Sequence, residues 1–251
     1  MLKTRVIPCL LLKDLRLIKT IQFSQHRNIG SYIAAVTVFN SRDVDELVFL
    51  DMSATNEQRD PLYPLISDIA RECFMPLAVG GGVRTLDHID RLLRVGADKV
   101  VLNTSSIENP DFITAGARRY GSQCIVISMD VRKTPNGYEV FRDHGTVPTG
   151  KNPVQWAQQV EELGAGEIFL TSIDHDGVMN GYDITLTKQV AQAVRIPVIA
   201  CGGAGIPKHC VEVVKDGRAD AVAAASIFQY TQYTPLDIKN ALVEAGIPAR
   251  V

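Results

Sequence analysis

The sequence predicts an α/β protein, a (β/α)8 TIM barrel that forms a single domain over residues 1–251. Eight short apolar runs are spread evenly along the chain, and amphipathic segments separate them. The second half of the chain also repeats the pattern of the first half. A barrel of alternating strands and helices typically needs about 250 residues, and this chain has 251.

The eight runs are almost continuously apolar rather than alternating. This pattern is typical of parallel strands that are covered on both faces. An open doubly wound sheet is the alternative, but eight evenly spaced strands suit a closed barrel better. We expect strands at residues 5–12, 46–51, 76–81, 99–103, 124–130, 167–172, 197–203 and 221–226.

The segments between the strands have helical periodicity. In "NPVQWAQQVEELGAG", Trp156, Val160 and Leu163 recur at the spacing of one helix face. The segment "TLDHIDRLLRVGAD" has Thr85 in N-cap position and Gly96 just past its end. These signals predict amphipathic helices packed on the outside of the barrel.

Three pairs of blocks indicate an internal duplication. "ELVFLDMSA" resembles "EIFLTSIDHDG", "PLAVGGGV" resembles "PVIACGGAG", and "RVGADKVVLNTSS" resembles "KDGRADAVAAASI". The offset is about 120 residues in each pair, which is too long for a solenoid unit. The barrel is therefore expected to consist of two half-barrel repeats. Residues 15–32 are too long for a minimal βα turn, and we expect them to form an active-site lid.

The composition is typical of a globular protein and argues against several other classes. The chain is 46% apolar and 22% charged, and its net charge of −2 argues against a general nucleic-acid binder. No apolar run is long enough to span a membrane, and no secretory signal is evident, so we expect a cytoplasmic protein. Five widely spaced cysteines form no disulfide framework, and Cys9, Cys124 and Cys201 are expected to be small buried residues.

We expect no metal site. The chain has no CxxC pair. His144 and His175 fall in segments expected to be exposed loops, and neither has a second ligand nearby in the sequence.

Glycines and small polar residues follow matching strands in the two halves. Backbone N–H groups can approach an anion at glycine, and the start of the next helix adds a favourable dipole. The duplicated pattern predicts two phosphate cups on one face, although glycines also serve simply to turn the chain. The expected phosphate-binding residues are Gly81, Gly82, Asn103, Thr104, Gly202, Gly203, Ala225 and Ser226.

Acidic residues end several strands between the two cups. Carboxylates in the mouth of a barrel are candidates for general acid–base work. We assign this role to Asp130 and Asp176, although the "DHDG" sequence around Asp176 is also good turn chemistry. Asp51 is expected to be structural.

The blocks "MLKTRVIPCL", "DELVFLDMSA", "PLAVGGGVR", "GADKVVLNTSSIENP", "GSQCIVISMD", "GAGEIFLTSIDHDG" and "ACGGAG" occur in order along nearly the whole chain. Together they resemble the cyclase subunit of imidazole glycerol phosphate synthase. The resemblance implies a barrel lyase with two phosphate sites and a glutaminase partner. Ammonia from the glutaminase would cross the barrel and react with a bis-phosphorylated ribonucleotide-derived amidine, without a cofactor.

The resemblance carries over residue by residue, with one large departure. The family has catalytic carboxylates at the ends of strands one and five. Asp130 matches the second, but Leu11 stands in place of the first. Lys19, Thr171 and Ser172 match positions expected to contact the substrate or its lid. His144 replaces a family serine.

The resemblance also implies an ammonia gate at the opposite end of the barrel. The family has four charged residues of alternating sign there, and all four match, as do two positions on the glutaminase-facing side. Charges at strand starts could instead stabilise any barrel. The gate residues are Arg5, Glu46, Lys99 and Glu167, and the partner-facing residues are Asp98 and Gln123.

Three functions therefore remain open. A diverged paralogue would use glutaminase-derived ammonia for amidine formation on a surface-polysaccharide sugar, together with a separate ligase. An authentic cyclase of histidine biosynthesis would fill the role of position 11 elsewhere. A non-catalytic phosphate-binding scaffold would only activate its glutaminase. The retained gate and the missing carboxylate favour the paralogue.

Overall fold

Eight parallel strands close into a barrel in the computed structural model, which describes residues 3–251. Each strand pairs in parallel with its neighbours, and pairing of the last strand with the first closes the ring. Every strand overlaps a run expected from the sequence, so the (β/α)8 prediction is confirmed and the open sheet is excluded. The strands are β1 (Arg5–Lys13), β4 (Leu47–Asp51), β5 (Leu77–Gly80), β6 (Lys99–Leu102), β7 (Ile125–Thr134), β10 (Glu167–Ser172), β11 (Val198–Cys201) and β12 (Ala221–Ala224).

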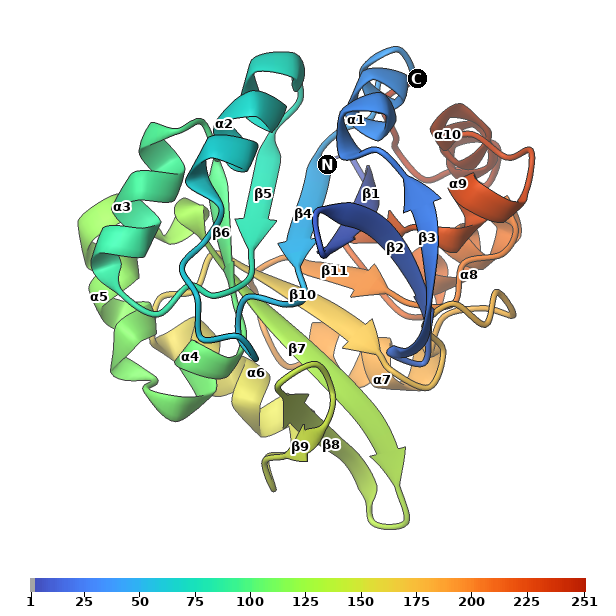
Figure 1. Cartoon of the computed structure of the whole chain (residues 1–251). Helices are drawn as coiled ribbons and strands as arrows, with labels where there is room; N and C mark the ends of the chain where they lie inside the picture. The colour runs from blue at the N-terminus through green and yellow to red at the C-terminus, as the bar shows by residue number, and fades with distance from the viewer. Residues whose placement is uncertain (1–2) are drawn as a thin grey trace.

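Helices surround the barrel, as Figure 1 shows. The expected caps are present: the Thr85 side chain accepts a hydrogen bond from the His88 N–H, and Gly96 follows with a φ of 113°. The helices are α1 (Tyr32–Asn40), α2 (Tyr63–Glu72), α3 (Leu86–Arg94), α4 (Thr104–Glu108), α5 (Asp111–Tyr120), α6 (Pro153–Glu162), α7 (Ile184–Ala191), α8 (Pro207–Lys215), α9 (Ser226–Tyr230) and α10 (Pro235–Glu244), with a 3-10 turn η1 (Ser122–Cys124).

Residues 15–32, which are expected to form an active-site lid, consist mainly of regular strands. They form an antiparallel hairpin of β2 (Arg16–Ile21) and β3 (Ser24–Gly30), and β2 also pairs with the end of β1. Gln22 and Phe23 form its two-residue turn, with φ values of 52° and 60°. Such turns usually contain Asn or Gly, so this sequence lacks the hairpin signal.

A second hairpin extends the fifth barrel strand. It is formed by the end of β7, β8 (Gly137–Arg142) and the short β9 (Val147–Pro148). Asp143 and His144, in the turn between β8 and β9, lie at the carboxyl end of the barrel.

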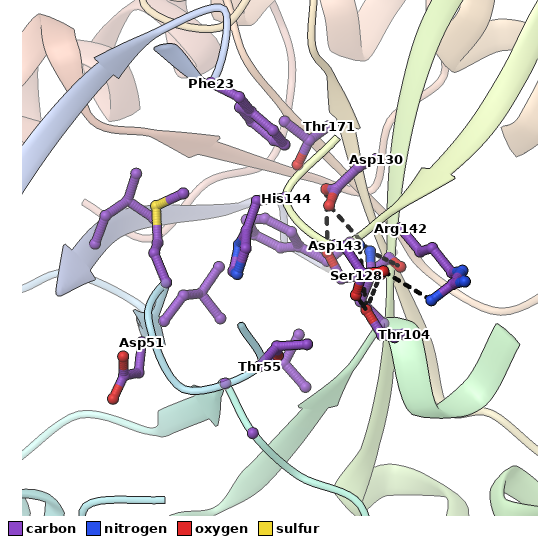
Figure 2. A pocket seen from close by; sticks show the side chains of 18 of the residues that line it. Phe23, Asp51, Thr55, Thr104, Ser128, Asp130, Arg142, Asp143, His144 and Thr171 are labelled. Atoms are coloured by element: carbon purple, nitrogen blue, oxygen red, sulfur yellow. Dashed lines mark hydrogen bonds and ion pairs between the residues drawn. The ribbon is translucent and has the colours of Figure 1, made fainter. Parts of the chain in front are cut away.

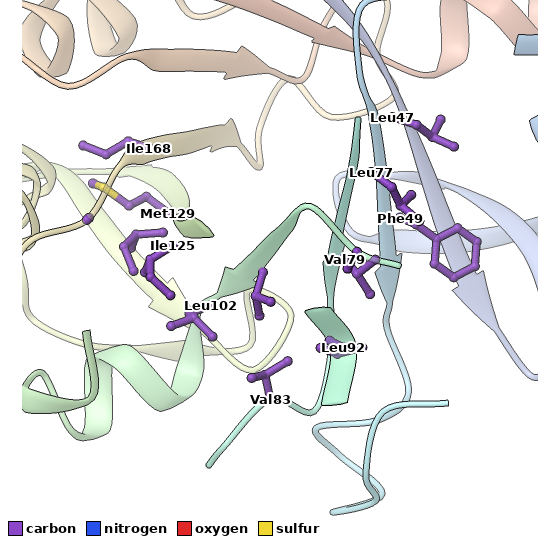
Figure 3. Packing of buried hydrophobic residues seen from close by; sticks show 14 of the residues in the cluster. Leu47, Phe49, Leu77, Val79, Val83, Leu92, Leu102, Ile125, Met129 and Ile168 are labelled. Atoms are coloured by element: carbon purple, nitrogen blue, oxygen red, sulfur yellow. The ribbon is translucent and has the colours of Figure 1, made fainter. Parts of the chain in front are cut away.

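Two apolar layers hold the barrel together. Outward-facing strand residues such as Phe49 and Val79 pack against the helices, and Figure 3 shows part of this layer. A smaller cluster fills the barrel interior with residues such as Ile7, Val101 and Phe169. Successive side chains along each strand point alternately outward to the helices and inward to the barrel, and this alternation separates the two layers.

The duplication expected from the sequence is visible in hydrogen bonds. Asp98 Oδ2 accepts the Leu77 N–H at 2.8 Å, and Asp220 Oδ2 accepts the Val198 N–H at 2.9 Å. Each of these carboxylates ties the start of one strand to the loop that precedes the next strand. The two halves therefore share tertiary contacts as well as sequence.

The expectation of buried cysteines holds for only one of the three positions. Cys9 is buried, whereas Cys124 and Cys201 are partly exposed. Cys124 lies in η1, before the strand begins, and Cys201 is the last residue of β11. Both positions are less completely covered than Cys9, which lies in the middle of β1. Within residues 3–251, no helix has both the length and the apolar character needed to cross a membrane.

A buried ion pair joins the last helix to the start of the barrel. Lys239 Nζ lies 3.2 Å from Asp45 Oδ1, both side chains are 3% exposed, and the ammonium also donates to the Asp43 carbonyl. Asp45 Oδ2 accepts the Val6 N–H at 2.8 Å. This pair therefore connects α10 to both β1 and the segment before β4.

Replacing Lys239→Ala should lower the free energy of unfolding by about 3–5 kcal/mol, because it leaves the Asp45 carboxylate buried without its cation. Urea denaturation would measure the change. Lys208→Ala is the matched control, since its pair with Glu212 is exposed and worth about 0–1 kcal/mol. Equal effects of the two substitutions would contradict the prediction.

Candidate active site

A cavity of about 440 Å³ opens at the carboxyl ends of the barrel strands, and Figure 2 shows it from close by. This is the end at which barrel enzymes carry their active sites. The sequence-predicted residues that line it are Leu11, Lys19, Gly81, Gly82, Asn103, Thr104, Asp130, Thr171, Asp176, Ala225 and Ser226.

Three predicted residues lie outside the cavity: Ser172, Gly202 and Gly203. Ser172 is buried, and its carbonyl accepts the N–H groups of His175 and Asp176. A Cβ at Gly203, where φ is 113°, would lie 2.0 Å from the Gly181 carbonyl oxygen. These glycines are therefore required for close backbone packing. The second cup presents only Ala225 and Ser226 to the cavity.

Gly81 in the first half has a similar packing role. Its φ is 109°, and a Cβ there would lie 2.3 Å from the Asp51 carbonyl oxygen. Unlike Gly202, however, Gly81 lines the cavity. In the first cup, Gly81 allows close backbone packing and also lines the cavity, as expected of an anion site. In the second cup, Gly202 and Gly203 allow close backbone packing but do not line the cavity.

Asp130, in β7, is the acid–base candidate that the geometry supports best. Asn103 Nδ2 donates to Asp130 Oδ2 at 3.0 Å, and the Ser128 hydroxyl lies 3.5 Å from Oδ1. Burial, with a further contribution from the charge of Asp176, raises the pKa of Asp130 to about 7, and Ser128 opposes the shift. A carboxyl group that titrates near neutral pH can both give and take a proton.

Asp176 is engaged by the β2–β3 hairpin. Its carboxylate accepts the Thr20 hydroxyl at 2.6 Å and the Phe23 N–H at 3.3 Å, and its carbonyl accepts the Gln22 N–H. Burial raises the pKa of Asp176, and these hydrogen bonds together with Lys19 oppose the shift. Asp176 therefore fastens the hairpin over the cavity in addition to lining it.

Lys19 brings a buried ammonium to the same cavity from β2. It is 3% exposed, and its Nζ donates to the Cys9 carbonyl at 3.0 Å. Burial lowers the pKa of Lys19, while Cys9, Asp176 and Cys201 act in the opposite direction. The hairpin is thus held against the barrel by Lys19 in β2 and, at its Gln22–Phe23 turn, by Asp176.

Leu11 makes one side of the cavity apolar. It pairs with Leu50 of β4, and both line the cavity. The corresponding pair in the second half is Asp130 with Thr171. The same position of the repeat therefore carries two leucines in one half and two polar side chains in the other.

Asp51 is held in a structural network, as expected. Arg59 contacts both of its carboxylate oxygens, at 2.7 and 2.8 Å. Its Oδ1 also accepts the backbone N–H groups of Ser53 and Ala54. These bonds fix the loop after β4.

Sequence reasoning missed a group of residues in the β8–β9 turn. Asp143 accepts the Thr104 hydroxyl at 3.1 Å and an Arg142 N–H at 2.7 Å, and Arg142 also contacts Glu108. Both His144 and His175, expected to be exposed, are partly buried. No sequence motif predicts these contacts, because they join the β8–β9 turn to α4, which lies more than 30 residues earlier in the chain.

The four charged residues at the strand starts form a continuous ring of ion pairs. Arg5 contacts Glu46 at 2.5 Å and Glu167 at 2.9 Å, and Lys99 contacts the same two carboxylates at 2.9 Å. Glu46 is 2% exposed. Arg5 and Leu11 stand at opposite ends of β1, about 20 Å apart at 3.3 Å per residue.

Asp98 and Gln123 are exposed at the same end as the ring. Asp98 also accepts the Leu77 N–H, so its carboxylate already has a structural bond. Among residues 3–251, His, Cys, Asp and Glu side chains nowhere gather in threes that could hold a metal ion.

A comparison with protein-family models gives one result. The model described as "Histidine biosynthesis protein" matches residues 5–234 of this chain. The match covers every barrel strand, both candidate phosphate cups and the ring at the strand starts.

Asp130→Asn should make the protein more stable above pH 7. The unfolded carboxyl loses its proton near 3.8 and the folded one near 7, so wild-type stability falls as pH rises between these values. The substitution should add about 1–4 kcal/mol to the free energy of unfolding at pH 8 and almost nothing below pH 4. Urea denaturation at both pH values would measure this, with Asp51→Asn, which should destabilise, as the control. A loss of stability at pH 8 in Asp130→Asn would contradict the prediction.

Proposed function

The chain belongs to the histidine biosynthesis protein family, which includes the cyclase subunit of imidazole glycerol phosphate synthase, and from this premise we propose that it is the synthase subunit of a glutamine amidotransferase. Its partner is a glutaminase subunit that docks at the end of the barrel carrying Asp98 and Gln123. Ammonia enters through the ring of Arg5, Glu46, Lys99 and Glu167 and reacts in the cavity at the other end.

The observation that carries the proposal is the intact ring at one end of a barrel that has Leu11 at the other. A ring of four ion-paired residues, two of them acidic and mostly buried, is costly unless each charge is satisfied. It is retained here although one carboxylate of the cyclase pair is absent. A use for ammonia that needs only part of the cyclase machinery accounts for both features.

The reaction we propose is amidine formation on a surface-polysaccharide sugar. A separate ligase would activate the acceptor, so that its carbon is already electrophilic when ammonia arrives. Asp130 would transfer protons, Lys19 would face the acceptor, and the cup around Gly82 and Thr104 would bind its phosphate. The hairpin held by Asp176 would exclude water from the reacting groups.

The authentic cyclase reaction of histidine biosynthesis is the second candidate. One feature of the cavity favours this reaction. Asp130 accepts a hydrogen bond from Asn103, and its pKa is raised to about 7, as general acid–base catalysis requires. Leu11 and Leu50 count against it, because neither side chain can exchange a proton.

An isotope experiment tests the proposal and separates the candidates. The complex with its glutaminase would receive glutamine labelled with ¹⁵N in the amide group. One arm contains the cyclase's phosphorylated ribonucleotide amidine, and the other contains a nucleotide-linked acetamido sugar with ATP and the ligase. Label in the sugar supports the proposal, and label in imidazole glycerol phosphate supports the second candidate. Release of all the label as free ammonia would indicate a scaffold that only activates the glutaminase.

Leu11→Asp should create cyclase activity, because it restores the second carboxylate opposite Asp130. General acid–base catalysis is worth about 10²–10⁴-fold, and we expect a gain of that order in turnover of the ribonucleotide amidine with free ammonium chloride. Leu50→Asp is the matched control, since it places the same charge on the neighbouring strand. Wild-type turnover above about 1 s⁻¹, an ordinary enzymatic rate, would contradict the paralogue assignment.

Arg5→Ala should open the ring and let ammonia escape. It removes the bridge between Glu46 and Glu167 on one side and leaves only Lys99 between them. The ratio of glutamate formed to aminated product should rise, while turnover with free ammonium chloride stays the same. Arg250→Ala, an exposed arginine at the same end, is the control. An unchanged ratio in Arg5→Ala would exclude a role for the ring in ammonia transfer.

A further inference from the structure

His144 stands out among the cavity residues because its ring nitrogen has no partner. It lines the cavity, and its Nε2 atom is buried without a hydrogen bond to any of residues 3–251. A buried polar atom that is left unpaired costs about 1–3 kcal/mol, so its persistence needs an explanation. A ligand in the cavity that exchanges a proton with Nε2 provides one.

The turn that carries the His144 imidazole has a strained backbone. Asp143, His144 and Gly145 follow one another in the left-handed region, with φ values of 49°, 56° and 72°. Non-glycine residues rarely adopt this conformation, and such strain concentrates at functional sites. The contacts of Asp143 with Thr104 and Arg142 keep the turn in this form.

The turn also fits closely under the lid. A Cβ at Gly145 would lie 2.9 Å from both Phe23 and Ile173. Figure 2 shows His144 between Asp130 and Asp51, with Phe23 above it. The turn that carries the imidazole therefore packs against Phe23 of the β2–β3 hairpin.

The titratable groups around His144 place it near the ends of β1 and β4. They are Asp143 on its own turn, Asp51 at the end of β4, and Lys13 and His26, which contact each other at 2.9 Å. Lys13 and Asp51 end β1 and β4, the two strands that carry Leu11 and Leu50. His144 therefore lies near two strands whose cavity-lining leucines cannot exchange a proton, while Asp51 at the end of β4 is engaged by Arg59.

We propose that His144 is the second proton-transfer residue of this site, acting through Nε2 on the side of the cavity where Leu11 stands in place of a carboxylate. The inference rests on the proposed ammonia-transfer function. It assigns the missing half of the acid–base pair to a residue of the β8–β9 turn rather than to a barrel strand.

The proton balance is complete with two residues. Ammonia forms a C–N bond to the activated carbon of the acceptor, and the bond from that carbon to its leaving oxygen breaks. The added nitrogen loses one proton, which neutral His144 accepts at Nε2. The leaving oxygen gains one proton, which the protonated Asp130 donates. Proton exchange between the two residues through water then restores both.

The pH dependence follows from the two groups. Burial lowers the pKa of His144 from its ordinary 6.5, with Asp143 and Asp51 opposing, so the imidazole is neutral above that lowered value. Asp130, faced by Asp176, keeps its proton up to about pH 7. Activity should rise with pH as His144 becomes neutral and fall above about pH 7 as Asp130 ionises.

The test uses the complex with its glutaminase, ammonium chloride and whichever acceptor became labelled in the isotope experiment. His144→Gln keeps the approximate size of the side chain but cannot titrate in this range, and His144→Ser introduces the family residue as a second variant. We expect both to lower kcat by about 10²–10⁴-fold and to remove the acid limb of the pH profile, with a much smaller effect on KM. Lys208→Gln, which changes an exposed side chain that does not line the cavity, is the control.

A spectroscopic measurement accompanies the kinetics. The ¹³C-labelled imidazole signal that disappears in His144→Gln should titrate with a midpoint below 6.5. Variants that keep the wild-type kcat or the acid limb would overturn the inference and leave the proposed function standing. Absence of ammonia-dependent product from the wild-type complex with either acceptor would overturn the proposed function, and the role of His144 with it.

Discussion

Closure of the barrel by β1 and β12 is the constraint on which the other features depend. Once eight parallel strands form a ring, every second residue of each strand must point into a narrow interior. Along β1 this alternation gives Arg5, Ile7, Cys9 and Leu11, from an ion-paired ring through an apolar centre to the cavity. One geometric rule therefore places the charged ring and the candidate active site at opposite ends of the same strand.

The two halves of the barrel share this geometry but differ in chemistry. Equivalent carboxylates tie the strand starts, and equivalent positive-φ glycines follow the third and seventh strands. At the cavity, however, one half presents Leu11 beside Leu50 and the other presents Asp130 beside Thr171. Burial without a nearby counter-charge raises the pKa of Asp130, so the polar half supplies a group that titrates near neutral pH. Leu11 and Leu50 form an apolar part of the cavity wall that cannot exchange a proton. His144, whose Nε2 atom has no hydrogen-bond partner among residues 3–251, comes to the cavity from another part of the chain, the β8–β9 turn.

Much of the fold could be predicted because its signals are local. Buried parallel strands are continuously apolar, and the Thr85 cap and the glycine after its helix mark element ends. The β2–β3 hairpin was missed because its turn residues, Gln22 and Phe23, are not those that usually adopt positive φ. At the site, eleven of the predicted residues meet in the cavity. Ser172, Gly202 and Gly203 do not, because the loop after β10 packs directly against those glycines.

The sequence by itself determined the strand order, the duplication, the ring charges and the absence of a carboxylate at position 11, since each depends on residue type at a position fixed by the strand period. Only the tertiary structure decided which carboxyl group is buried without a cation, that Asp176 fastens the β2–β3 hairpin, and that His144 lines the cavity. These properties depend on contacts between segments far apart in the chain, such as Thr20 with Asp176 and Thr104 with Asp143. Desolvation and hydrogen-bond partners, which set the chemistry of a side chain, exist only once those segments are packed together.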